Sequence, residues 1–174
     1  MRALQFWKAV TMDRSDFLDR LLEALATAKI GYCVIGGAAV NAYAEPVVTL
    51  DLDIAVAMTD VERAEELLSR EFKVRRFAHS VNVSAAGSNL SVQIQTDPRY
   101  ASFVDRARPA EVLGIQLPVA AVEDVLQGKV WAAEDSSRSR SKRVKDLGDI
   151  LRLIEIYPEL RDRVPSEVLA QIPQ

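Results

Sequence analysis

The 174-residue sequence is poor in the residues that build disulfides and zinc sites, with one cysteine and one histidine. Cys33 has no partner for an internal disulfide, and the apolar run 32–35 around it is typical of a small buried side chain. His79 has no second histidine or cysteine with which to share a zinc ion, so we expect it to be structural or in contact with solvent. The sequence thus excludes a disulfide scaffold and argues against a zinc protein.

No hydrophobic run reaches the roughly 18 residues of a membrane span, and neither sign of charge dominates. The 22 lysines and arginines against 25 aspartates and glutamates give a formal net charge of −3. This balance excludes a uniformly basic nucleic-acid-binding surface, although it leaves room for a local basic patch. Lys8 lies where a signal peptide would have its apolar core, so we expect a cytoplasmic protein with no membrane partner.

Hydrophobic periodicity predicts an α+β protein in which a mixed β-sheet, flanked by helices, is followed by a helical C-terminal third. We expect a single domain of residues 1–174, with the mixed core in 1–118 and the helical part in 119–174. The pattern predicts strands at 32–35, 48–57, 72–77, 80–85, 90–96 and 112–117. It predicts helices at 15–28, 38–43, 59–71, 98–106, 122–134, 144–156 and 167–170.

Local signals indicate where several of these helices begin. Ser15 is expected to be an N-cap, Thr59 to Glu62 is a capping-box sequence, and Asp97-Pro98 is typical of a helix start. The serine-rich basic run 136–143 has the composition of a linker.

The predicted strand 48–57 has one polar face. Asp51 and Asp53 are separated by one residue, so their side chains project from the same face and can share a hard divalent cation. Thr49 shares that face, and the opposite face is apolar, with Val48, Leu50, Leu52 and Ile54. Acidic pairs of this kind also occur on exposed sheet faces without a function.

Gly36 and Gly37 end the strand 32–35 and open a helix whose free N–H groups favour a bound phosphate. Without side chains, the two glycines allow the backbone to approach a phosphate closely. A glycine pair alone is equally typical of a tight turn. Combined with the acidic strand that follows, it indicates a site for a metal and a nucleotide.

The glycine pair, thirteen intervening residues and the run Asp51-Leu52-Asp53-Ile54 resemble the signature of the polymerase-β-like nucleotidyltransferase superfamily. Within it, residues 36–43 and 49–53 are similar to the AbiEii-type and minimal nucleotidyltransferases of bacteria. Lys129 and the later Lys145-Asp146 pair extend the resemblance, which covers about residues 15 to 157.

The resemblance implies transfer of a nucleoside monophosphate from an NTP such as ATP to a hydroxyl of RNA, tRNA included, of a protein or of a small molecule. Asp51 and Asp53 would hold Mg²⁺ or Mn²⁺, which neutralises charge on the reacting phosphates. Lys129 and Asp146 complete the implied catalytic set. The residues implied to bind the nucleotide are Gly36, Gly37, Thr49, Lys142, Arg143 and Lys145.

The sequence departs from the family pattern on the strand 90–96, where many members have a third carboxylate. The polar face of that strand offers Ser91, Gln93 and Gln95, and an amide cannot serve as a general base. Asp97 or Asp146 could supply the missing group, the acceptor could bring its own base, or the site could bind nucleotide without turnover. In addition, residues 45–48 lack an arginine that many relatives have there.

Three features keep other interpretations open. The cations of residues 138–145 are compatible with a solvated surface or with an RNA-binding module, and Asp146 and Asp149 with a polar helix face. Gln93 and Gln95 favour a catalytically silent nucleotide- or partner-binding module. Such a module could belong to a toxin–antitoxin pair, with the cognate toxin or antitoxin as its partner.

Overall fold

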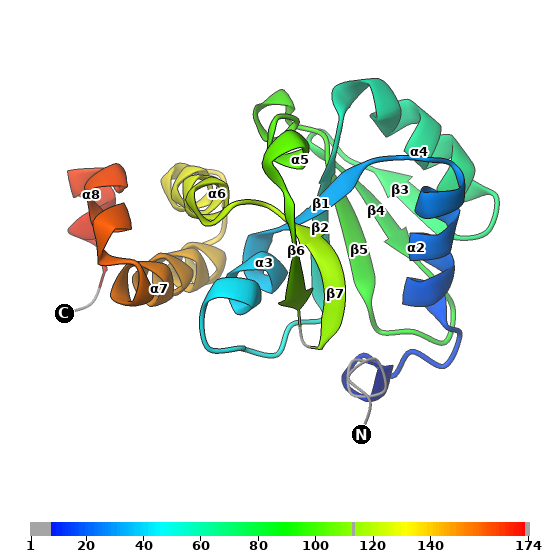
Figure 1. Ribbon diagram of the computed structural model, residues 1–174, viewed down its shortest axis with the longest axis horizontal. Helices are drawn as coiled ribbons and strands as arrows, with labels where there is room; N and C mark the ends of the chain where they lie inside the picture. Colours follow the sequence, from blue (N-terminus) through cyan, green and yellow to red (C-terminus); the bar gives the residue numbers. More distant parts are fainter. Residues whose placement is uncertain (1–7, 113, 173–174) are drawn as a thin grey trace.

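The computed structural model describes residues 8–112 and 114–172, which form a mixed seven-stranded sheet with helices on both faces (Figure 1). The strand order in the sheet is β3-β4-β5-β2-β1-β7-β6. The strands are β1 Tyr32–Ile35, β2 Asp51–Val56, β3 Lys73–Arg76, β4 Ser80–Ser84, β5 Ser91–Gln95, β6 Arg108–Val112 and β7 Ile115–Val119. The predicted α+β class is confirmed.

The helices fall on two sides of this sheet (Figure 1). They are α2 Phe17–Thr27, α3 Gly36–Tyr43, α4 Val61–Ser69, α5 Phe103–Arg106, α6 Val122–Glu134, α7 Arg140–Ile156 and α8 Ser166–Leu169. Three 3₁₀ helices join them, η1 Met58–Asp60, η2 Pro98–Tyr100 and η3 Pro158–Arg163. Helices α2 and α4 cover one face, and α3, α6 and α7 lie on the other side. None of the helices within the described ranges has the length and hydrophobicity needed to cross a bilayer.

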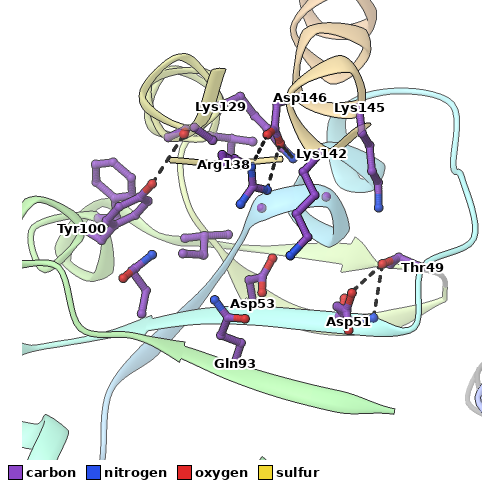
Figure 2. A pocket seen from close by; sticks show the side chains of 18 of the residues that line it. Thr49, Asp51, Asp53, Gln93, Tyr100, Lys129, Arg138, Lys142, Lys145 and Asp146 are labelled. Atoms are coloured by element: carbon purple, nitrogen blue, oxygen red, sulfur yellow. Dashed lines mark hydrogen bonds and ion pairs between the residues drawn. The ribbon is translucent and has the colours of Figure 1, made fainter. Parts of the chain in front are cut away.

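Strand β2 lies at the centre of the sheet, between β1 and β5. Its alternation buries Leu52 and Ile54 completely, on the face away from Asp51 and Asp53. The side chains of Asp51 and Asp53 therefore point to the opposite face, toward α6 and α7 (Figure 2). The parallel pairing of β2 with β5 sets Asp53 beside Gln93.

The single cysteine and the single histidine have the surroundings we expected. Cys33 is fully buried in β1, and His79 is exposed in the turn before β4. The N-terminal segment that bears on the signal-peptide prediction lies mostly outside the described residues.

The structure corrects the start of the central strand. Strand β2 begins at Asp51, and Val48 and Leu50, predicted to face inward, are 56% and 44% exposed. The preceding loop is hydrogen-bonded to α3. The Asn41 side chain accepts a hydrogen bond from the Val47 N–H at 2.9 Å and donates one to the Val47 carbonyl at 2.7 Å. These bonds hold the preceding loop against a helix instead of a neighbouring strand.

The prediction of one strand at 112–117 is also wrong. Two antiparallel strands are found there, β6 and β7, in which Pro109 lies opposite Pro118. Proline has no N–H for the sheet ladder and is rare inside strands. Pro109 and Pro118 therefore interrupt the sequence pattern from which these two strands would be predicted. Strand β6 is at the sheet edge, where such a gap is tolerated.

Two helix starts in the polar segments differ from the prediction. Helix α7 begins at Arg140, so the second half of the expected linker 136–143 is helical. Its first turn is mostly exposed, and an exposed helical turn has the same polar composition as a linker. Helix α4 begins at Val61, and the expected capping box makes no side-chain cap hydrogen bond.

The start of α2 is fixed by Asp13 instead of the predicted N-cap Ser15. The buried Asp13 carboxylate accepts hydrogen bonds from the N–H groups of Phe17 at 3.0 Å and Leu18 at 3.2 Å. Ser15 donates to the same carboxylate at 3.1 Å. Burial alone would raise the pKa of Asp13, but these hydrogen bonds hold it below the ordinary value of 3.8.

We predict that Asp13→Ala lowers the free energy of unfolding at pH 7 by about 1–2 kcal/mol, because two buried N–H groups at the start of α2 lose their acceptor. Because the pKa of Asp13 is lowered in the folded state, its ionised carboxylate stabilises the fold above pH 3.8. This stabilisation is lost as the pH falls through the folded-state pKa. Urea unfolding at pH 7 and pH 3 checks both statements. A difference between wild type and variant that grew toward pH 3 would contradict them.

Candidate functional site

A cavity of about 360 Å³ opens on the polar face of the sheet, between the sheet and helices α6 and α7 (Figure 2). Nearly all the site residues expected from the sequence line this cavity: Gly36, Gly37, Thr49, Asp51, Asp53, Lys129, Lys142, Lys145 and Asp146. Arg143 does not line it. Arg143 is half-buried on α7, and its Nε has no hydrogen-bond partner among the described residues.

Gly36 is the point at which α3 meets the acidic strand. Its φ is +66°, and a Cβ built there would lie 3.1 Å from the Cβ of Asp53 and closer still to Oδ2. Both the left-handed backbone and the lack of space require glycine. The tight contact places the first turn of α3, with its free N–H groups, against the Asp53 carboxylate.

Asp51 and Asp53 project from β2 into the same cavity (Figure 2). Asp51 is exposed, and Thr49 closes the turn before it, with the Thr49 hydroxyl accepting from the Asp51 N–H at 3.3 Å. Asp53 is half-buried. Burial, opposed by the nearby Lys129 cation and assisted by the Asp51 charge, raises its pKa to about 6. A bound cation would relieve this cost of the ionised form.

The donor set fits Mg²⁺ better than a metal that needs a full protein cage. No group of three or more histidine, cysteine, aspartate or glutamate side chains that could hold a metal occurs within the described ranges. Mg²⁺ is usually held by one or two carboxylates together with substrate phosphates and water. Asp51 and Asp53 provide the two carboxylates, and the cavity leaves room for the phosphates.

Lys129 is a buried cation on α6, 6% exposed, between two carboxylates of α7. Its Nζ lies 3.0 Å from Asp146 Oδ1 and 2.7 Å from Asp149 Oδ2. Burial alone would lower the pKa of Lys129, but Asp149 and Asp146 raise it. Arg138 adds a second cation to Asp146, with Nε donating to Oδ2 at 2.6 Å. The polar helix face expected for Asp146 and Asp149 is therefore a buried ionic network.

The network continues to the loop before β2. Arg152 donates to Asp149 Oδ1 at 2.8 Å and to Asn41 Oδ1 at 3.1 Å, and also to the Glu45 carbonyl. The loop 44–50, which contains no arginine, is thus held by an arginine from α7. Sequence reasoning missed the contribution of Asn41, because its contact with Arg152 joins residues 111 positions apart.

Lys142 and Lys145 are the free cations of the site. Both side chains are exposed on the first turns of α7 and point into the cavity above Asp51 and Asp53 (Figure 2). No ion pair with a carboxylate engages either of them in the described part of the chain, in contrast to Lys129 and Arg138. They are available to a bound anion.

One end of the cavity is lined by aromatic side chains, a feature the sequence did not reveal. Tyr100 and Phe103 line it and pack edge to face, with ring centroids 5.3 Å apart. Trp131 packs against both rings, with its centroid 5.9 Å from that of Phe103 and 5.2 Å from that of Tyr100. The only available signal was the aromatic spacing around the short helix after Asp97, which is equally typical of core packing.

Comparison with known proteins identifies the fold. The chain matches no protein-family model and no curated protein. Among solved structures it is similar to the antibiotic-resistance factor ANT(2'')-Ia, with a TM-score of 0.59 and 13% identity over 91% of this chain and 96% of that one. The lincosamide antibiotic adenylyltransferase LnuA gives a TM-score of 0.52 and 12% identity over 80% and 97% of the two chains.

A third solved structure, of a Thermotoga maritima protein with a provisional nucleotidyltransferase assignment, has a TM-score of 0.52. Its sequence is 20% identical over 81% of this chain and 96% of that one. The chain therefore has the fold of the nucleotidyltransferases, as the resemblance in the sequence predicted.

We predict that Gly36→Ala lowers the free energy of unfolding by about 1–3 kcal/mol, because a Cβ there has a strained backbone and displaces Asp53. Gly148→Ala in the interior of α7 is the matched control, since a Cβ there meets nothing within 4 Å. The control should be stabilised by about 0.5–1 kcal/mol. Urea unfolding of both variants checks the prediction, and equal effects would refute the close fit at Gly36.

We predict different effects for two lysines of the cavity. Lys129→Met should lower the free energy of unfolding by about 3–5 kcal/mol, because it leaves two buried carboxylates without their shared cation. Lys142→Met should change it by no more than about 0.5 kcal/mol, since that side chain is exposed. Thermal and urea unfolding distinguish the two, and a mild effect at Lys129 would show that its ion pairs are replaceable.

Proposed function

We propose that this chain is a Mg²⁺-dependent nucleotidyltransferase that moves a nucleoside monophosphate from an NTP to an acceptor oxygen. The observation that carries the proposal is the cavity in which Gly36, Asp51 and Asp53 face Lys142 and Lys145, two cations with no ion pair among the described residues. Carboxylates for a cation, free N–H groups and unpaired lysines are together what a metal-bound triphosphate requires.

In this proposal each group has a separate task. Asp51 and Asp53 hold Mg²⁺, which supplies charge neutralisation at the reacting phosphates when bound. The N–H groups of the first turn of α3, beginning at Gly36, receive phosphate oxygens. Lys142 and Lys145 neutralise the charge of the leaving pyrophosphate. Lys129 and Asp146, which the resemblance gave catalytic roles, act by fixing α7 above the sheet.

The acceptor expected from the sequence is a hydroxyl, and hydroxyl transfer needs a group that removes the proton. Asp97, considered for this role, is bound by Arg99 through both carboxylate oxygens and does not line the cavity. Asp146, the other candidate, is held by Lys129 and Arg138. Gln93 beside Asp53 therefore favours a second candidate function, a nucleotide-binding module without turnover.

We predict that purified protein incubated with Mg²⁺ and each α-labelled NTP, with total tRNA and small-molecule acceptors, transfers label. Asp51→Asn and Asp53→Asn should each reduce transfer more than about 100-fold and weaken Mg²⁺-dependent NTP binding, because the cation loses a ligand. Asp162→Asn, an exposed aspartate on η3 outside the cavity, is the control. NTP binding that is unchanged in both variants would refute the site, and binding without any transfer would favour the silent module.

A further inference from the structure

The cavity has no carboxylate that is free to take a proton from an acceptor, among the residues the structure describes. Four aspartates line it. Asp124 is held by Arg106 through both oxygens, at 2.7 and 2.8 Å, and Asp146 is held by Lys129 and Arg138. Asp51 and Asp53 are the proposed cation ligands.

The side chains on the sheet floor of the cavity beside Asp53 are neutral amides, which can donate hydrogen bonds. The sheet register sets Gln93 beside Asp53 on one side and Asn82 beside Gln93 on the other, so a row of amides continues the floor of the cavity from β2 across β5 to β4. Tyr100, at the aromatic end of the cavity, is a neutral phenol at pH 7, and burial raises its pKa from 10 to about 12. An amide row of this kind hydrogen-bonds an anion without repelling it.

The opposite wall of the cavity carries Lys142 and Lys145, which have no carboxylate partner in the described part of the chain. A neutral acceptor hydroxyl would find cations and amide donors there but no proton acceptor. A dianionic acceptor would find the charges and donors it needs, and its nucleophilic oxygen carries no proton to remove.

We propose that the acceptor is a phosphomonoester, whose phosphate oxygen attacks the α-phosphorus of the bound NTP, and that Gln93 selects this class of acceptor. A bond forms between the acceptor phosphate oxygen and the α-phosphorus. The bond from the α-phosphorus to the bridging oxygen breaks, and pyrophosphate leaves with that electron pair. The product contains a new P–O–P link, and no proton is transferred. This inference rests on the proposed nucleotidyl transfer and specifies its acceptor.

Inorganic phosphate tests the proposal without knowledge of the organic group. With Mg²⁺, unlabelled NTP and ³²P-labelled phosphate, attack on the α-phosphorus produces NDP whose β-phosphate carries the label, whereas hydrolysis of NTP produces unlabelled NDP. A second comparison uses matched pairs, glycerol 3-phosphate against glycerol and glucose 1-phosphate against glucose, with α-labelled NTP. We expect label in NDP and transfer to the phosphates at least about 100-fold faster than to the alcohols.

The role of Gln93 is tested by Gln93→Glu, which places a carboxylate beside Asp53. We expect transfer to glycerol 3-phosphate to fall at least roughly tenfold through charge repulsion, and transfer to glycerol to rise roughly 10- to 100-fold through general-base assistance. Gln116→Glu, an exposed position on β7 outside the cavity, adds the same charge as a control and should change neither rate.

The possible failures of the two proposals are distinguishable. Protein that does not bind Mg²⁺ and NTP overturns the proposed function. Protein that binds them but labels neither NDP nor a phosphomonoester, or that labels alcohols or tRNA hydroxyls at an equal or higher rate, overturns the phosphate acceptor alone. Equal acceptor preference in wild type and Gln93→Glu overturns the role of Gln93.

Discussion

The buried cation of Lys129 is the constraint on which the arrangement of the site depends. Burying a lysine to 6% exposure costs free energy unless its charge is paired. Here two carboxylates of α7 form ion pairs with the Lys129 ammonium group. Because Asp146 and Asp149 lie one turn apart on α7, the two contacts fix both the rotation and the height of that helix relative to α6. The position of everything else on α7 follows from this pairing.

The charged side chains around α7 fall into two groups, those paired within this ionic network and those outside it. Arg138 and Arg152 complete the pairing of the two buried carboxylates, so neither carboxylate is left to repel a bound phosphate. Lys142 and Lys145, on the first turns of the same helix, form no ion pair with residues 8–112 or 114–172 and point toward Asp51 and Asp53 (Figure 2). One helix thus contributes both the buried ion pairs and the two exposed lysines that we propose bind phosphate.

Local patterns predicted the parts of the site that local geometry determines. Gly36 and Asp53 were found because a glycine turn and an alternating strand each leave a signal within a few residues. The loop before β2 was misread as strand, since its conformation depends on Asn41 and on Arg152, which approaches from α7. Asp149 was left as a surface residue for the same reason, because its partner Lys129 lies on another helix. Contacts between distant segments carry no sequence period from which to predict them.

The chemical effect of a glutamine at position 93, where a carboxylate was expected, depends on its place in the sheet. Its amide matters because the parallel register of β2 and β5 sets it beside Asp53, at the point nearest the proposed cation ligands. A carboxylate at that position would add negative charge next to a group whose pKa is already raised by burial and by Asp51. The amide removes that repulsion and the proton acceptor at the same time. An acceptor that arrives as an anion is compatible with both losses, whereas a hydroxyl lacks the proton acceptor that it needs.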